Sequence, residues 1–249
     1  MDTTFWLGNL SEWLGVVAVV MIAGVSPLLK KIKPIMFRFP RREATYALSL
    51  FAVSYILAFQ FYSGPVFGFL RDFSGIFPGG VLAQQMLLAV ICLVIFILAV
   101  ILRGQPLFSL GWQKENLRAG LIVGLLAIVV TLFLRGKFLT LLKGVAPEVA
   151  GLLPVWLAYA FAEEMIFRGY IQLRMDSFLG PRWGWLAAAG LFVLWQLPGR
   201  LWLFPAAQIW QPILISSIQG LICGWMMKKT GHVTAPALFR AFSGWIALV

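Results

Sequence analysis

Long apolar stretches recur along the whole chain, separated by short polar breaks. A helix needs about 20 apolar residues to cross the hydrocarbon core of a bilayer. The stretches that approach this length cover residues 13–29, 44–62, 81–102, 119–134, 150–170, 183–197, 211–227 and 233–248. The sixth and the eighth are short enough to be tilted, buried or re-entrant. The pattern predicts an all-α polytopic membrane protein with about eight transmembrane helices.

The composition agrees with a protein that is embedded in lipid. Of the 249 residues, 61% are hydrophobic and 12% are charged, whereas soluble domains are about 45–50% apolar. No polar block is long enough to form a separate soluble domain. Asp2 and Glu12 stand where a cleaved signal peptide would carry basic residues, so we expect the first apolar segment to remain as an anchor.

The net charge of +11 indicates an orientation in the membrane. With the amino terminus outside, the inner connections carry 14 basic residues: Lys30, Lys31, Lys33, Arg38, Arg41, Arg42, Arg103, Lys114, Arg118, Arg168, Arg174, Arg182, Lys228 and Lys229. The outer connections carry five: Arg71, Arg135, Lys137, Lys143 and Arg200. Basic residues gather on the cytoplasmic side of membrane proteins. We therefore expect both termini outside, an inner face that suits anionic lipid, and no nucleic-acid partner.

Two adjacent carboxylates interrupt the fifth apolar segment, in the stretch "FAEEMIFRGY". On a helix Glu164 and Arg168 share a face and can form an ion pair. Glu163 is rotated by about 100° from Glu164 and needs another partner. A charge at the bilayer centre costs at least about 2.5–3.5 kcal/mol. An interfacial salt bridge would explain one pair and leave Glu163 over, so we favour a polar cavity, either functional or inherited.

Three short elements in order carry a family resemblance. They are "EEMIFR" at 163–168, "FVLWQLP" at 192–198 and "TGHVTAPALFRAFSG" at 230–244. These elements resemble the motifs Glu-Glu-x-x-x-Arg, Phe-x-x-x-His and His-x-x-x-Asn of the CPBP (Abi) family of intramembrane proteases, which includes the type II CAAX prenyl proteases. The resemblance covers approximately residues 100–249. The apolar segments predict transmembrane helices over residues 1–100. The resemblance implies a CAAX-protease-like membrane domain over 101–249 and the inner (cytoplasmic) membrane of a bacterium.

The resemblance also implies roles for the residues that match the motifs. In the family the first glutamate activates a water that attacks the scissile peptide carbonyl, and the histidines and asparagine assist the base and stabilise the oxyanion. Carried over by position, Glu163 matches this base, and Glu164 and Arg168 match its supports. Phe192 matches the phenylalanine of the second motif.

Three motif positions depart from the family pattern. Gln196 and Arg240 stand at the two motif histidines, and Gly244 stands at the asparagine. Losing a positioned acid–base group costs about 10²- to 10⁴-fold in rate, and losing an oxyanion donor about 10²- to 10³-fold. The single histidine, His232, is expected to be a satisfied interfacial residue. A catalytic zinc generally has three protein ligands, so we expect no metal and no other cofactor.

The sequence is compatible with three functions. The favoured one is a catalytically degenerate pseudoprotease that is a binding or structural subunit for membrane lipid, a transmembrane segment or a larger membrane complex. Charge balance supports it, since Glu163 and Glu164 facing Arg168 and Arg240 would sum to zero. The alternative is an active endopeptidase that uses Glu163 and cleaves membrane-linked peptides. The third is a transporter or lipid-handling protein, although no inverted repeat is evident.

Overall fold

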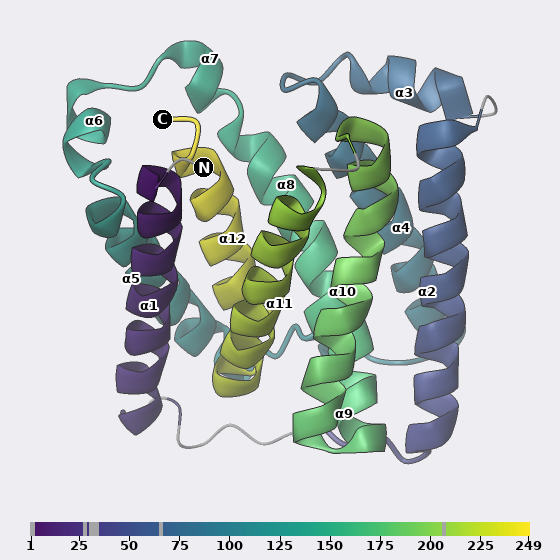
Figure 1. The fold of residues 1–249 in the computed structure, drawn as a ribbon. Helices are drawn as coiled ribbons and strands as arrows, with labels where there is room; N and C mark the ends of the chain where they lie inside the picture. Colours follow the sequence, from purple (N-terminus) through teal and green to yellow (C-terminus); the bar gives the residue numbers. More distant parts are fainter. Residues whose placement is uncertain (1–2, 27–28, 30–34, 65–66, 206–207) are drawn as a thin grey trace.

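The computed structural model describes residues 3–26, 29, 35–64, 67–205 and 208–249. Throughout these residues the chain forms helices and turns, with no strand (Figure 1). The all-α class predicted from the sequence is confirmed.

Eight long helical stretches dominate the fold. Seven of them contain α1 (Thr3–Val25), α2 (Pro40–Ser63), α4 (Val81–Leu102), α5 (Leu117–Leu134), α10 (Pro181–Leu203), α11 (Trp210–Thr230) and α12 (Thr234–Ile246). The eighth is continuous through α8 (Leu153–Glu164), the π-helix η4 (Met165–Gln172) and α9 (Leu173–Leu179). The short elements are α3 (Gly68–Ser74), η2 (Leu107–Leu110), η3 (Lys114–Asn116), α6 (Phe138–Lys143) and α7 (Pro147–Ala150).

Six of the described helical stretches have the length and hydropathy needed to span a membrane, and they lie at 6–25, 40–63, 81–102, 114–134, 147–179 and 181–203. Helices α11 and α12 do not reach that standard. Helix α12 has 13 residues, which gives a length of about 20 Å, less than the roughly 30 Å of the hydrocarbon core. The prediction of a polytopic membrane protein is confirmed, with six of the eight expected spans meeting both criteria.

The sixth segment is longer than the sequence suggested. Helix α10 has 23 residues. It continues beyond the predicted end at residue 197, through Pro198 to Leu203. Proline lacks the backbone N–H of a helical hydrogen bond and usually bends or ends a helix. Here the neighbours of α10, including Tyr62 packed beside Gly199, hold the last turn against α2. The expectation of a short sixth segment was therefore wrong.

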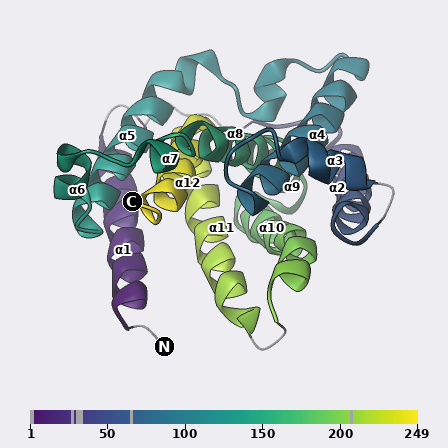
Figure 2. The same cartoon turned by 90° about the horizontal axis from the view of Figure 1, so that it is seen from above.

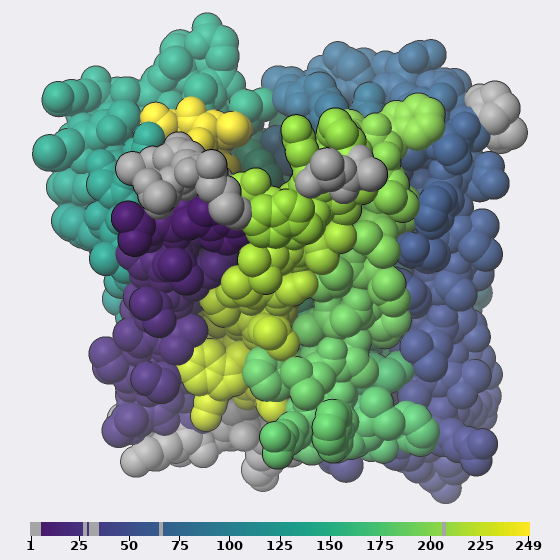
Figure 3. Space-filling view, viewed as in Figure 1, coloured from purple at the N-terminus to yellow at the C-terminus, as the bar shows by residue number. Residues whose placement is uncertain are grey.

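The helices before residue 100 pack directly on those after it. Helix α1 lies against α5 and α11, α2 against α9 and α10, and α4 against α8 (Figures 1 and 2). Helix α12 contacts α5, α8 and α11 and is covered by them. The space-filling view shows α1, α11, α10 and α2 side by side on one face (Figure 3). Helices α8 and α12 therefore lie behind this face, between it and helices α4 and α5.

Two glycines explain how the central helical stretch ends and packs. Gly180 has a φ of +83°, which favours glycine, and it separates α9 from α10, whose first residue is Pro181. Because η4 and α9 continue the helix to Leu179, the fifth segment is longer than the expected 150–170. At Gly169 a Cβ would lie 2.0 Å from the carbonyl oxygen of Leu110. The absence of a side chain there lets η2 approach η4.

Both termini lie at one end of the bundle (Figure 1). The opposite end carries the connections into α2, between α4 and α5, between α9 and α10, and between α11 and α12. Its described basic residues are Arg38, Arg41, Arg42, Arg103, Lys114, Arg118, Arg182, Lys228 and Lys229. Lys30, Lys31 and Lys33 fall outside the described residues, and Arg168 and Arg174 are buried inside the bundle. We call this the basic end of the molecule.

Candidate functional site

Both glutamates of the first motif lie at the last turn of α8, where the α-helix passes into η4. Their exposed fractions are 1% for Glu163 and 0% for Glu164. π-Helical turns are rare in proteins, and those that occur often lie at functional sites. The two carboxylates are thus buried at the centre of the bundle, at an irregular point in its longest helical stretch.

Glu163 is hydrogen-bonded on both of its carboxylate oxygens. Trp195 Nε1 donates to Oε1 at 2.5 Å, and Gln196 Nε2 lies 3.1 Å from Oε1 and 3.3 Å from Oε2. Arg240 Nη2 donates to Oε2 and forms an ion pair with it. Gln196 and Arg240, the two residues matched by sequence to motif histidines, therefore both hydrogen-bond Glu163.

Glu164 is held between two arginines. Arg168 Nε donates to its Oε2 at 3.1 Å, which is the i,i+4 pair expected from the sequence. Arg240 Nη1 donates to its Oε1 at 3.2 Å. Arg240 from α12 thus bridges both carboxylates of α8. We call Glu163, Glu164, Arg168 and Arg240 the central network; its formal charges sum to zero.

One aromatic ring contacts both arginines of the central network. The guanidinium carbon of Arg240 lies 4.6 Å from the centroid of Phe192, and that of Arg168 lies 5.1 Å from it. Arg240 also lies 5.2 Å from the ring centroid of Tyr159. Cation–π contacts of this kind stabilise a desolvated charge. Phe192, the matched phenylalanine of the second motif, thus supports both cations.

Gly244 does not take part in the network. A Cβ at this position would lie 2.4 Å from the ring of Trp156. The indole therefore fills the space that a motif asparagine would need. Restoring Asn at this position would also require a change at Trp156.

His232 lies away from the carboxylates, in the turn between α11 and α12. Its Nδ1 accepts a hydrogen bond from the backbone N–H of Thr234 at 3.1 Å and lies 2.7 Å from the Thr234 hydroxyl. Its ring packs edge-on against Trp112. Burial lowers the pKa of His232 to about 4, so the ring is neutral near pH 7. Its role is to order the start of α12, as expected for a satisfied histidine.

A small cavity adjoins Glu163. Its volume is about 10 Å³, and its lining consists of Tyr62, Gln85, Leu88, Tyr159, Glu163, Trp195, Gln196 and Gly199. A space of this size holds about one water molecule. In the described part of the chain, no three His, Cys, Asp or Glu side chains gather where they could bind a metal ion.

A second buried polar cluster was missed in the sequence analysis. Glu43 of α2 accepts hydrogen bonds from Arg103 and from Arg174, the latter at 3.1 Å. Arg174 also donates to the carbonyl oxygens of Ser109 and Tyr170, at 3.0 and 3.1 Å. We call Glu43, Arg103 and Arg174 the basic-end clamp. Glu43 and Arg174 are 131 residues apart, so no local spacing pointed to their pairing.

A fourth buried carboxylate attaches the first helix to the bundle. Glu12 of α1 forms an ion pair with Arg135, which follows α5, and Arg135 also donates to Asn9 at 2.9 Å. The exposed fraction of Glu12 is 0%. The residue considered in the sequence only as evidence against a signal peptide thus attaches α1 to the bundle.

Comparison with known families gives a match over the carboxy-terminal part of the chain. Residues 145–246 match the family model described as "Type II CAAX prenyl endopeptidase Rce1-like". The match contains all three motif stretches and begins later than the residue 100 expected from the sequence. The resemblance to the CPBP family is thereby confirmed for this stretch. Curated proteins and solved structures give no match to the chain.

Proposed function

Because the chain is a CAAX protease-like membrane protein, we propose that it is a pseudoprotease: a catalytically inactive relative that serves as a binding or structural subunit in the membrane. The observation that carries this proposal is the position of Arg240. Arg240 matches a motif histidine by sequence position, and its guanidinium bridges the carboxylates of Glu163 and Glu164.

The chemistry of a general base supports this interpretation. A carboxylate that activates water needs a free lone pair directed at that water and a route for the proton. Both oxygens of Glu163 already accept hydrogen bonds from Trp195, Gln196 or Arg240. Arginine stays protonated and glutamine does not titrate near neutral pH, so neither residue can accept a proton from the base.

Cleavage assays test the proposal. The full chain, Glu163→Gln and the control Glu148→Gln, altered at an exposed residue of α7, would be reconstituted in liposomes. Each would be mixed with lipid-anchored and transmembrane reporter peptides. We expect the same background rate for all three proteins. Turnover by the native chain that is lost in Glu163→Gln and kept in Glu148→Gln would overturn the proposal.

One observation favours a second candidate, an active glutamate-dependent endopeptidase. The cavity of about 10 Å³ adjoins Glu163 and has room for about one water molecule. In this case Arg240 would leave Glu163 during turnover and donate to the oxyanion. Arg240→Gln would then lower kcat by about 10²-fold or more, whereas the pseudoprotease has no turnover to lose.

For the location, we propose the inner membrane of a bacterium, with both termini outside. The excess of basic residues at the end opposite the termini supports this orientation. A carboxy-terminal tag should be cleaved by protease added to spheroplasts. Protection of the tag until the cells are lysed would reverse the orientation.

A further inference from the structure

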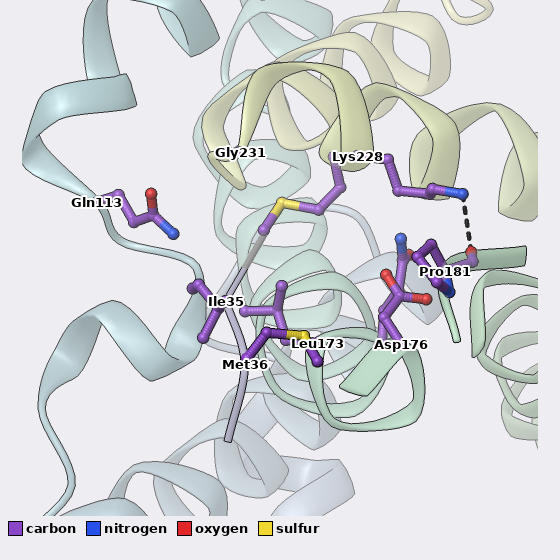
Figure 4. Close-up of a pocket in the computed structure, with 10 residues that line it drawn as sticks. Ile35, Met36, Gln113, Leu173, Asp176, Pro181, Lys228 and Gly231 are labelled. Carbon is purple, nitrogen blue, oxygen red and sulfur yellow. Dashed lines mark hydrogen bonds between the residues drawn. The ribbon is translucent and has the colours of Figure 1, made fainter. Parts of the chain in front are cut away.

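A second, larger cavity opens at the basic end of the molecule (Figure 4). Its volume is about 230 Å³, and it is lined by Ile35, Met36, Gln113, Gln172, Leu173, Asp176, Pro181, Met227, Lys228 and Gly231. These residues come from η4, α9, the start of α10, the end of α11 and three connecting segments. The cavity therefore lies where lipid headgroups would meet the bundle in the proposed orientation.

Gln172 presents an acceptor that has no donor. Its Nε2 donates to the carbonyl oxygen of Gly224 at 2.9 Å, which fixes the orientation of the amide. The residue is fully buried, and its Oε1 has no hydrogen-bond partner in the part of the chain that is described. A buried acceptor without a donor costs about 1–3 kcal/mol. This oxygen is therefore suited to a ligand that donates a hydrogen bond.

Asp176 adds a negative charge one helical turn further on. Its Oδ1 is also buried and has no partner among the described residues. Figure 4 shows its carboxylate beside the cavity, on the side of Pro181 and Lys228. A carboxylate and an amide oxygen four residues apart lie on one helix face, so both can reach a single donor. Together they favour a cationic group with several N–H bonds.

A positive charge stands at the same cavity. Lys228 Nζ donates to the carbonyl oxygen of Pro181 at 2.7 Å and has two further N–H bonds. Lys229 follows it in the last turn of α11. An anionic group next to the ligand's cation would be placed favourably against the Lys228 ammonium group. The arrangement is thus complementary to a ligand with both charges.

The rest of the lining is apolar. Ile35, Met36 and Leu173 lie together on one side of the cavity (Figure 4), and Met227 of α11 also lines it. This wall suits the hydrocarbon next to a lipid headgroup rather than a fully hydrated ion.

We propose that this cavity binds the headgroup of an aminophospholipid. The primary ammonium donates to Gln172 Oε1 and Asp176 Oδ1, the phosphate lies near Lys228, and the acyl chains leave along the apolar wall. Phosphatidylcholine offers no N–H bond to the two acceptors, and phosphatidylglycerol offers no cation. The inference deepens the proposed binding role by naming a ligand. It does not depend on the state of Glu163.

Lipid competition tests the assignment. The full chain in mixed micelles would be offered phosphatidylethanolamine, phosphatidylcholine and phosphatidylglycerol with identical acyl chains, and bound lipid would be counted by native mass spectrometry. We expect phosphatidylethanolamine to bind about tenfold more tightly than either competitor, since charge-assisted hydrogen bonds are lost with the others. Asp176→Asn should remove this preference. Asp72→Asn, an exposed change on α3 at the opposite end, should keep it.

A second variant and a soluble probe complete the test. Leu173→Trp should fill the cavity and weaken lipid binding even if Asp176→Asn fails to fold. Free phosphoethanolamine should compete poorly, because it lacks the chains that contact the apolar wall. Equal binding of the three lipids, a preference that survives Asp176→Asn, or full competition by phosphoethanolamine would overturn the proposal. None of these outcomes bears on peptide cleavage, which tests the proposed function separately.

Discussion

Arg168 and Arg174 lie on the same helical stretch and are both fully buried, but their surroundings differ. All three guanidinium nitrogens of Arg174 donate hydrogen bonds, to Glu43, Gln105 and two backbone carbonyl oxygens. Arg168 donates only through Nε, to Glu164, and its Nη1 and Nη2 have no partner in the described part of the chain. Arg174 is thus fully hydrogen-bonded, as expected for a cation that stabilises the fold. Arg168 is not.

The two clusters also differ in their charge balance. The basic-end clamp has one acid for two arginines, with Arg174 surrounded by further acceptors, whereas the central network has two acids and two arginines. Buried ion pairs are tolerated when they are balanced and hydrogen-bonded. The comparison indicates that the clamp stabilises the fold, and the incomplete hydrogen bonding of Arg168 agrees with the proposed pseudoprotease, in which the central network is an inherited site.

The largest effect is expected from the clamp. Glu43→Gln would leave Arg103 and Arg174 without their shared carboxylate, and removing one partner of a buried pair costs about 3–5 kcal/mol. We expect a loss near the upper end of that range, measured by denaturant unfolding in micelles. Glu115→Gln, at an exposed residue of η3, is the control and should change little. A loss below about 1 kcal/mol in Glu43→Gln would show that the clamp is not structural.

A change in the central network should lower the free energy of unfolding by less, and a second change should recover part of the loss. Arg240→Leu would leave Glu163 without its cation but would keep the pair of Glu164 with Arg168, so we expect a loss of about 3 kcal/mol. The double variant Arg240→Leu/Glu163→Gln restores the charge balance and should regain more than half of it. A double-mutant cycle measures this coupling. Strict additivity of the two changes would contradict the bridging geometry.

A still smaller effect is expected when only the first glutamate is neutralised. In Glu163→Gln the new amide oxygen can still accept from Trp195 or Arg240, and Arg240 keeps Glu164 as its counter-ion. We expect a loss of about 1 kcal/mol or less in thermal or denaturant unfolding. If this variant were destabilised as strongly as Glu43→Gln, the difference between the two clusters would not exist.

The smallest effect concerns pH and lies outside both clusters. The pKa of His232 is lowered to about 4 in the folded chain from 6.5. The unfolded chain therefore binds more protons between these values, and stability is fully present above pH 6.5 and falls as the pH drops toward 4. Between pH 7 and pH 6 we expect a change below about 1 kcal/mol. His232→Asn should flatten this slope, and an unchanged slope would contradict a buried neutral imidazole.

The sequence predicted the parts of the molecule that depend on local spacing. The length of the apolar stretches predicted the long helices, and the i,i+4 spacing predicted the pair of Glu164 with Arg168. The match of motif positions, with charge balance, placed Arg240 opposite the glutamates. Each of these predictions uses either neighbours on one helix or the register of a known motif.

The remaining features depend on contacts between distant segments. Glu43 meets Arg174 across 131 residues, and Trp156 fills the space beside Gly244 from another helix. The sequence alone gave no sign that η4 would be π-helical or that α10 would continue through Pro198. The packing of neighbouring helices decides these points, and one-dimensional patterns do not contain it.

The proposed pseudoprotease depends on Arg240 bridging the carboxylates of Glu163 and Glu164. The most direct measurement is a cryo-EM map of the chain in lipid nanodiscs that defines the Arg240 side chain. We predict guanidinium density that joins Glu163 and Glu164, with Phe192 and Tyr159 packed against it. The proposal would be contradicted if Arg240 pointed away from the carboxylates and Glu163 faced a water-filled cavity large enough to admit a peptide.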